Sequence, residues 1–165
     1  GRSVEGDQYA GDEKKVSIGK GVCLREGKNA KVSVLTLGAI GNTVMEAIGL
    51  LGERLEAKGE EARIAHYDMR WLKPMDESIL TEVAEKYHTI ITVEDGVISG
   101  GLGSAVAEFI LDYSKCKMQN AKSPHLIRLG VNDQFVEHGS TKELYHLLKL
   151  DKEGICESLL QALEQ

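Results

Sequence analysis

Cysteine is scarce in this sequence and forms no recognisable pattern. The three cysteines, Cys23, Cys116 and Cys156, are widely spaced and odd in number, and no Cys-x-x-Cys motif occurs. Disulfide-stabilised domains and structural zinc sites both need several cysteines at regular spacing. We therefore expect neither of these, and we predict a reducing, cytoplasmic setting.

Positive charge and long apolar runs are also lacking. The chain has 20 Lys and Arg against 26 Asp and Glu, a formal net charge of −6, and no basic stripe. Nucleic acids and anionic membrane surfaces attract basic proteins, so the sequence argues against both as partners. No apolar run approaches the roughly 20 residues that a membrane-spanning helix requires.

The patterns of common catalytic and metal sites are missing as well. No two of the histidines have the His-x-x-x-His spacing of a metal site, and no serine lies in a Gly-x-Ser-x-Gly turn. We therefore predict no catalytic, cofactor-binding or metal-binding residue in this chain. His66 lies within an apolar run and is interpreted as a histidine of the core.

The sequence does contain enough apolar residues for one domain. Its 165 residues are 42% hydrophobic and 28% charged, which is ordinary for a globular protein. Residues 1–14 are polar and lack hydrophobic periodicity, so we interpret them as the remnant of an interdomain linker and residues 15–165 as the domain. Since no initiator Met is present, we expect a piece of a longer polypeptide.

Short apolar runs alternate with helical patterns along this domain. Strands are predicted at 16–18, 22–25, 31–37, 62–67, 89–93 and 125–129, and the first two form a hairpin around Gly19-Lys20-Gly21. The first helical pattern has the apolar stripe Val44, Ile48, Leu51 and Leu55. This alternation predicts an α/β fold with a mostly parallel sheet, right-handed crossovers and helices on both faces.

Local signals set the helix ends. These are the stop Gly59, the caps Asp76 and Asp151, and the capping box Ser140-Thr141-Lys142-Glu143, after which Leu144, Leu147 and Leu148 are expected to face inward. Gly49 and Gly52 lie inside the first helix, where each costs about 1 kcal/mol relative to alanine. We expect close packing against the sheet to offset that cost. Residues 114–123 are polar and are expected to form an exposed loop.

The stretch from Thr89 to Ile110 organises the rest of the chain. A buried strand ends at Glu94, and the helix pattern begins after Gly100, Gly101 and Gly103. Glycines at such a turn let two backbones approach closely, or let an anion reach free amides at the helix start. Gly101 to Val106 matches two glycines of the dinucleotide fingerprint, but Val106 occupies the third small position. We favour helix–sheet packing over nucleotide binding here.

A second glycine turn, Gly38-Ala39-Ile40-Gly41-Asn42, precedes another helix. In an open α/β sheet both turns lie at the carboxyl ends of strands, where ligands bind. A small regulatory anion bound at Gly38, Gly41 and Asn42, or beside Glu94 at the other turn, is therefore our binding hypothesis.

Two further segments are candidates for an interface or a site. Arg70-Trp71 follows a predicted strand, and an aromatic residue beside an arginine is typical of interface anchors, although the pair can also cover the edge of the core. His138 lies beside a glutamate in a predicted loop, where function is more common than within a strand. A structural role is the alternative for His138.

Three segments in a fixed order resemble one enzyme family. They are Asp68–Asp76 (DMRWLKPMD), Thr92–Val106 (TVEDGVISGGLGSAV) and Leu129–Gly139 (LGVNDQFVEHG). The first two are similar to transketolases in general and to the decarboxylase β subunits of 2-oxo-acid dehydrogenases. Phe135–Gly139 and Leu150–Ile155 more narrowly resemble the C-terminal domain of the 1-deoxy-D-xylulose-5-phosphate synthases. The resemblance covers Val16 to Leu163.

The resemblance implies a homodimeric enzyme that condenses pyruvate with glyceraldehyde 3-phosphate, releases CO2 and makes a precursor of isoprenoids, thiamine and pyridoxal phosphate. It implies thiamine diphosphate and Mg²⁺ as cofactors, held by N-terminal and middle domains that would be this chain's partners. Glu94-Asp95-Gly96 with Asn120 is a poor match to the family's magnesium motif, because Glu94 replaces the first glycine. For the C-terminal domain it implies three layers, five strands with one antiparallel, and a role in dimer contact or regulation. Asp95-Gly96 stands where the synthases more often have Glu-Asn, so the choice among relatives stays open.

Overall fold

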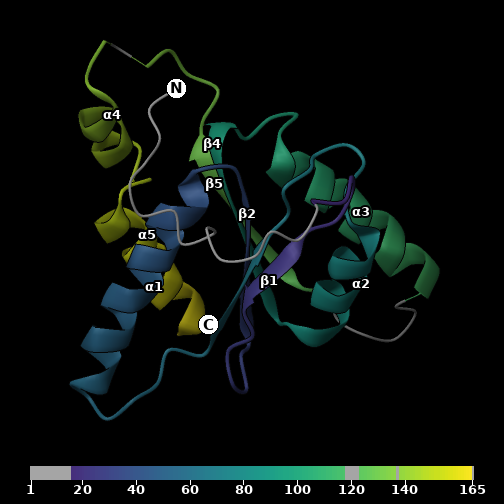
Figure 1. Cartoon of the computed structure of the whole chain (residues 1–165), viewed down its shortest axis with the longest axis horizontal. Helices are drawn as coiled ribbons and strands as arrows, with labels where there is room; N and C mark the ends of the chain where they lie inside the picture. The colour runs from purple at the N-terminus through teal and green to yellow at the C-terminus, as the bar shows by residue number, and fades with distance from the viewer. Residues whose placement is uncertain (1–15, 118–122, 137, 165) are drawn as a thin grey trace.

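The computed structural model describes residues 16–117, 123–136 and 138–164, so the linker predicted at residues 1–14 and the metal-motif candidate Asn120 lie outside the described residues. Strands and helices alternate along the chain (Figure 1). The strands are β1 (Val22–Arg25), β2 (Val32–Leu37), β3 (Ile64–Asp68), β4 (Thr89–Val97) and β5 (His125–Val131). The helices are α1 (Ile40–Glu56), α2 (Glu77–Lys86), α3 (Leu102–Lys117), α4 (Thr141–Leu147) and α5 (Lys152–Leu163). None of the described helices is long and apolar enough to cross a bilayer.

The five strands form one mostly parallel sheet with the order β1-β3-β2-β4-β5. β2 lies at its centre and is parallel to both neighbours, and β4 is parallel to β5. Only β1, at one edge, runs antiparallel, with Val22 paired to Asp68. This arrangement confirms the predicted fold class, including the single antiparallel strand.

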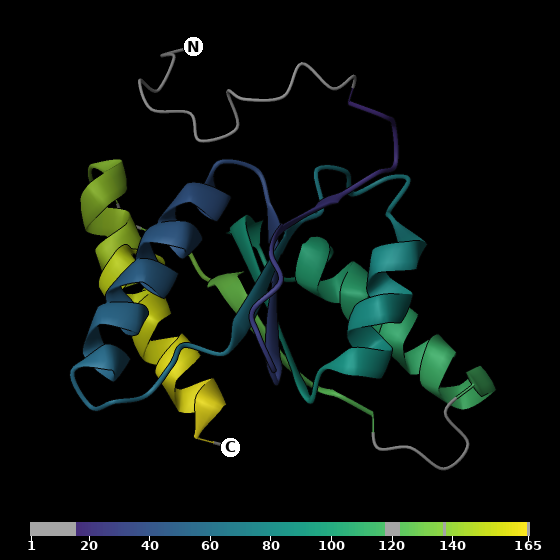
Figure 2. The ribbon, with the colours of Figure 1, turned by 60° about the horizontal axis from the view of Figure 1, so that its bottom comes forward.

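Helices cover both faces of the sheet and make three layers, as Figure 2 shows. On one face α1 and α5 enclose a core with the strand residues Val34 and Val93. On the other face α2 and α3 enclose a second core around Leu35 and Ile90. Adjacent residues such as Val34 and Leu35 serve opposite cores because successive side chains of a strand point to opposite faces.

The predicted helix signals are confirmed at most positions. The α1 stripe Val44, Ile48, Leu51 and Leu55 is buried. Asp76 accepts a hydrogen bond from the Ser78 amide at 3.1 Å, and Asp151 accepts one from the Gly154 amide at 2.9 Å. The Ser140–Glu143 capping box is present at the start of α4.

The predicted hairpin at the start of the domain is wrong. Residues 16–18 are not a strand, and β1 pairs with β3 instead. The amide of Lys20 donates to the Ser17 carbonyl in a turn, and the amide of Gly21 donates to the Asp76 carboxylate at 3.1 Å. Residues 17–21 therefore pack beside the start of α2. β1 pairs with β3 because β3 is a longer partner than residues 16–18 would be.

Three helix and strand predictions also need correction. β4 continues past residue 93 to Val97, since Val97 pairs with Val131 after a shift in register. α3 continues to Lys117, so residues 114–117 are helical rather than part of a loop, while residues 118–122 lie outside the described residues. Leu147 is 69% exposed instead of facing inward, because the short α4 buries no residue.

Gly49 and Gly52 were expected to pack closely against the sheet, and this is wrong. A Cβ added at either position would meet no atom within 4 Å. Both glycines lie away from the buried stripe of α1. They therefore lower the helix propensity of α1 without a packing contact that offsets the cost.

Candidate functional site at the carboxyl edge of the sheet

Four parallel strands end at one edge of the sheet, which we call the carboxyl edge. β3 ends at Asp68, β2 at Leu37, β4 at Val97 and β5 at Val131. The antiparallel β1 begins there, since Val22 pairs with Asp68. All the candidate site residues follow or terminate these strands except His138, which lies further along the β5–α4 connection.

Glu94 fixes the turn between β4 and α3. Its side chain is buried, at 6% exposure, and its two carboxylate oxygens accept hydrogen bonds from the amides of Leu102 and Gly103 at 2.8 and 2.9 Å. These amides belong to the first turn of α3, where a helix leaves donors without partners and favours negative charge. Glu94 therefore caps a helix that starts eight residues after it.

This cap occupies the place where we expected an external anion. The amides of Leu102 and Gly103 already donate to Glu94, and the amide of Gly100 donates to the Ser104 hydroxyl at 2.9 Å. A Cβ at Gly101 would overlap the Glu94 carboxylate and lie 2.8 Å from the Val97 carbonyl oxygen. A Cβ at Gly103 would lie 2.8 Å from Cδ of Arg128, whereas a Cβ at Gly100 would meet no atom within 4 Å. Close packing, the interpretation we favoured over nucleotide binding, thus accounts for Gly101 and Gly103 but not for Gly100.

The turn before α1 is built differently. Gly38 has a φ of +84°, which favours glycine, and a Cβ there would meet no atom within 4 Å. The amides of Gly41 and Asn42 close the turn by donating to the carbonyls of Gly38 and Ala39, both at 3.1 Å. The cap residue Ala39 offers no side-chain acceptor. Anion binding at Gly38, Gly41 and Asn42 stays a prediction.

A buried polar cluster lies on the α1 face of the same edge. The His66 ring nitrogen Nε2 is 3.0 Å from the Thr36 hydroxyl, which donates to the Tyr67 carbonyl at 3.3 Å. His66 is 1% exposed, and burial lowers its pKa to about 4. Burial raises the pKa of Asp68, although the amide and charge of Arg70 oppose the rise. His66 is thus a core histidine with a hydrogen-bond partner, as predicted.

Arg70 and Trp71 follow β3 at this edge. Arg70 is exposed and has a φ of +57°; its amide donates to the Asp68 carboxylate at 3.0 Å, and its Nε lies 3.8 Å from the same group. The indole nitrogen of Trp71 is buried and has no hydrogen-bond partner among the described residues. Arg70 therefore organises the strand end, and an interface role for the pair stays a prediction.

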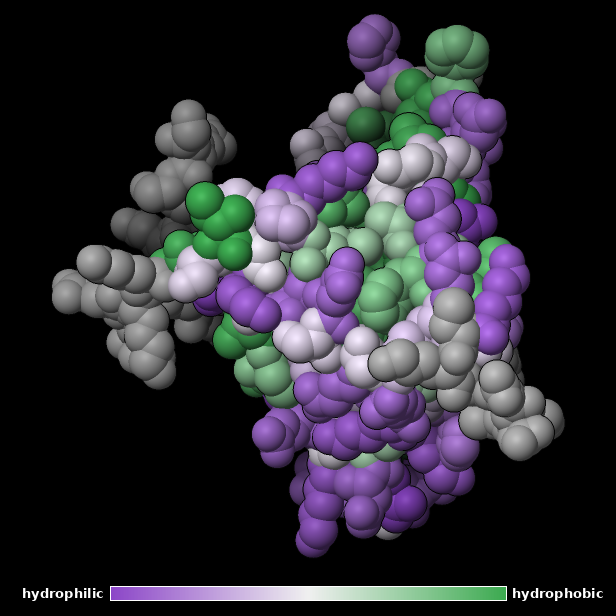
Figure 3. Space-filling model, turned by 90° about the vertical axis from the view of Figure 1, so that its right-hand side faces the viewer, coloured by the Kyte–Doolittle hydropathy of each residue, from purple (hydrophilic) through white to green (hydrophobic). Residues whose placement is uncertain are grey.

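β4 and β5 continue past the ends of β2 and β3 as a two-stranded extension. Val97 pairs with Val131, and the Ile98 amide donates to the Val131 carbonyl at 2.9 Å. Val97 is 48% exposed and Phe135, just after β5, is fully exposed. Figure 3 shows apolar side chains gathered at the top of this side of the molecule, above a mostly hydrophilic lower half. We call Val97, Ile98, Val131 and Phe135 the apolar patch.

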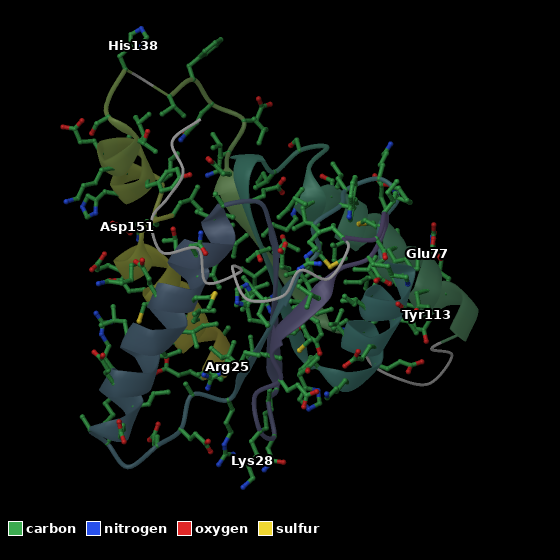
Figure 4. The ribbon with its side chains drawn as sticks, in the orientation of Figure 1. Arg25, Lys28, Glu77, Tyr113, His138 and Asp151 are labelled. Atoms are coloured by element: carbon green, nitrogen blue, oxygen red, sulfur yellow. The ribbon has the colours of Figure 1, made fainter. Side chains whose placement is uncertain are left out.

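His138 is not brought together with the other candidates. It is exposed on the connection between β5 and α4, and Figure 4 shows its side chain at the outer end of that connection, pointing away from the sheet. Its neighbour Glu137 lies outside the described residues. Another histidine, His146 on α4, does pair with an acid: its Nδ1 atom is 2.6 Å from Oδ2 of Asp151, the cap of α5.

The acidic side chains of this edge include Asp68 and Glu94. The described residues contain no group of three or more His, Cys, Asp or Glu side chains that could hold a metal ion. Glu94 is committed to two amides and Asp68 to the Arg70 amide. A hollow of about 880 Å³ lies at the opposite edge of the sheet. Its rim mixes acidic and basic side chains: Lys31, Lys58 and Arg63 with Glu56, Glu60, Glu61 and Glu164.

Sequence reasoning missed the role of Glu94 as a helix cap. An acidic residue near the end of a strand, followed eight residues later by the start of a helix, was the available signal. It was not decisive because the register shift in β4 determines where that carboxylate points. The Thr36–His66 contact was missed for a similar reason, since it joins two strands that are 30 residues apart.

Comparison with known proteins places this geometry in a family. The family model of the transketolase C-terminal domain matches residues 19–155, so the chain belongs to that family. A 1-deoxy-D-xylulose-5-phosphate synthase of Parabacteroides distasonis is 49% identical over 142 residues, covering 86% of this chain and 20% of that protein. The synthase of Phocaeicola vulgatus is 46% identical over 146 residues, covering 88% of this chain and 21% of that protein.

Solved structures agree with the fold. A split-gene transketolase, described as an inactive β4 tetramer, has a TM-score of 0.70 at 31% identity, over 91% of this chain and 44% of that one. A Pichia stipitis transketolase has a TM-score of 0.57 at 18% identity, over 86% of this chain and 17% of that one, a likeness of fold alone. The chain thus spans about a fifth of the length of the curated relatives it matches.

Proposed function

We propose that this chain is the C-terminal domain of a thiamine-diphosphate-dependent 1-deoxy-D-xylulose-5-phosphate synthase. The complete enzyme condenses pyruvate with glyceraldehyde 3-phosphate and releases CO2, in the cytoplasm and as a homodimer. The observation that carries the proposal is the 40–49% identity to five synthases over 85–90% of this chain. The identity to the split-gene transketolase is lower, at 31%, although it extends over a similar share of the chain.

In this proposal the domain supports catalysis without taking part in it. Glu94 and Asp68 at the carboxyl edge accept hydrogen bonds from amides of the domain, and no cluster among the described residues fits Mg²⁺. Thiamine diphosphate, which supplies the carbanion chemistry of such enzymes when bound, would be held with Mg²⁺ by the preceding four-fifths of the polypeptide. This chain supplies a rigid three-layer body against which those parts pack.

A domain exchange tests the proposal. The matching 142-residue segment of the Parabacteroides synthase is replaced by the corresponding segment of this chain, and pyruvate-dependent formation of 1-deoxy-D-xylulose 5-phosphate is measured with the coenzyme and Mg²⁺. We expect the exchanged enzyme to keep activity within about tenfold of the unmodified synthase, and the isolated chain to show none.

Two outcomes contradict the proposal. Turnover by the isolated chain would place the chemistry here. A folded, exchanged enzyme that transfers two-carbon units between sugar phosphates, but does not consume pyruvate, would favour a transketolase instead.

A further inference from the structure

We propose that the apolar patch at the carboxyl edge is the surface on which this domain docks against the preceding part of its own polypeptide, with Phe135 as the central contact. The inference rests on the proposed function only in requiring that the domain belongs to a longer chain. It assigns a face of the domain, a residue and a partner, which membership of the family does not.

The patch contains two exposed apolar side chains. Phe135 is fully exposed and Val97 is 48% exposed, while Ile98 and Val131 are half-buried. An aromatic side chain buries 150–250 Å² when it is covered, and aromatic residues are enriched in the centres of interfaces. Contiguous exposed apolar patches in folded proteins commonly mark such interaction sites.

An ordered backbone presents the patch. The Ile98 amide donates to the Val131 carbonyl at 2.9 Å, so the two strands stay joined beyond the register shift in β4. Ile98 also packs over Gly130, where an added Cβ would lie 2.7 Å from its Cγ2 atom. Glycine at position 130 therefore leaves room for the side chain of Ile98. A preorganised surface loses less entropy on binding than a loose loop.

The partner that we propose for the apolar patch follows from where the chain enters the domain. β1 runs antiparallel to β3, and Val22 at its start pairs with Asp68 at the end of β3. Just before it, a Cβ at Gly19 would lie 2.9 Å from Cγ of Pro74, which also follows β3. The polypeptide therefore arrives at the carboxyl edge, on the same side as the patch.

The curated relatives are about five times longer than the segment they share with this chain, and the family is a C-terminal domain. What precedes the domain is thus large and enters at this edge. β3 and β5 are three strand spacings apart, about 14 Å.

Hydrogen exchange in the exchanged synthase tests the docking. Amide exchange of residues 131–136 is measured in the isolated 165-residue chain and in the Parabacteroides synthase that carries this domain. We expect exchange of these amides to be slowed at least about tenfold in the longer protein. Residues 56–60, at the opposite edge, serve as the internal control and should exchange equally in both. Equal exchange of residues 131–136 in both proteins would overturn the proposal.

A matched pair of variants separates docking from folding. Phe135→Asp replaces a fully exposed residue, so the melting temperature of the isolated chain should be unchanged, whereas that of the longer protein should fall by several degrees. Leu111→Asp changes an apolar residue of α3 that is 57% exposed, and it should leave both proteins unchanged. If Phe135→Asp and Leu111→Asp behave alike in the longer protein, Phe135 is not a docking contact.

The remaining outcomes distinguish this inference from the proposed function. Slowed exchange in a folded but inactive exchanged protein would support docking and contradict the synthase assignment. An active exchanged protein in which the amides of residues 131–136 exchange as fast as in the isolated chain would support the synthase assignment and contradict docking. A dimer of the isolated chain in analytical ultracentrifugation that Phe135→Asp dissociates would show that the patch binds a second copy, which overturns the intramolecular partner.

Discussion

Acid should destabilise this fold through His66. The ring is 1% exposed, and its Nε2–H donates to the Thr36 hydroxyl oxygen, because that hydroxyl spends its own hydrogen on the Tyr67 carbonyl. Both the neutral ring and the imidazolium can make this hydrogen bond, so it is burial that favours the neutral imidazole in the folded state. Burial lowers the pKa of His66 to about 4, against 6.5 for an exposed histidine.

The sign and size of the effect follow from proton linkage. Between pH 6.5 and 4 the unfolded chain binds a proton at this residue and the folded protein does not, so stability falls as the pH falls. A difference of 2.5 pH units, from 6.5 to about 4, corresponds to a loss of about 3 kcal/mol. Above pH 6.5 the imidazole is neutral in both states and the full stability is present.

The comparison uses urea denaturation of the wild type and of His66→Gln at pH 7.0 and pH 4.5. Glutamine keeps an amide donor for Thr36 but does not titrate. The wild type should lose about 2 to 3 kcal/mol more than the variant over this range. Carboxyl groups contribute equally to both proteins, including Asp68, whose pKa burial raises and whose effect on stability has the opposite sign. The difference between the two proteins therefore isolates the imidazole.

A second histidine provides the control. His88 lies just before β4 and is exposed, so its side chain contacts water in both the folded and the unfolded state. We therefore expect His88→Gln to leave the loss of stability between pH 7.0 and pH 4.5 unchanged. Equal losses in the wild type and in His66→Gln would refute the reasoning, since they would mean that the folded state accepts the proton as readily as the unfolded chain.

Four further substitutions test the packing at pH 7 by urea denaturation. Gly52→Ala should stabilise the fold by about 1 kcal/mol, because a Cβ there meets no atom within 4 Å. Gly101→Ala should instead destabilise it, because the Cβ would overlap Glu94, and equal effects of these two changes would contradict the packing. Glu94→Gln should cost about 1–3 kcal/mol, because an acceptor for one amide of α3 becomes a donor. Asp151→Ala should cost about 1 kcal/mol through loss of the cap on the Gly154 amide, and a neutral effect would show that neither this cap nor the contact of Asp151 with His146 stabilises the fold.

The parts of the fold that could be predicted are those coded within one element. The α1 stripe repeats within 12 residues, from Val44 to Leu55, and caps such as Asp151 act on an amide three residues away. Such signals do not depend on the rest of the chain. The alternation of strands and helices then limits the sheet to a few topologies, of which the mostly parallel one is observed.

The predictions that were wrong concern contacts between residues that are far apart in the sequence. β1 was assigned to a local hairpin, yet its partner is β3, about 40 residues later. The two glycines of α1 were assigned a packing role that only the position of the sheet could decide. A periodic pattern states which residues are buried, but it does not state which neighbour buries them.

The carboxyl edge shows the same division within the candidate site. The sequence indicated charged and glycine-rich turns, from which a bound anion followed naturally. In the structure Glu94 is enclosed by the amides of its own α3 helix, and Asp68 accepts from the Arg70 amide. An added anion beside Glu94 would face a buried negative charge instead of free donors, which is unfavourable in a low-dielectric setting.

The outer surface of this edge exposes the apolar side chains Phe135 and Val97 beside polar ones such as Asp95 and Asp133. Removing apolar side chains from water is favourable in free energy. Removing charged side chains from water costs free energy, which new hydrogen bonds would have to offset. An edge whose buried acids already accept hydrogen bonds from amides, and which also exposes apolar side chains, favours the packing against protein that we propose over the binding of an anion beside Glu94.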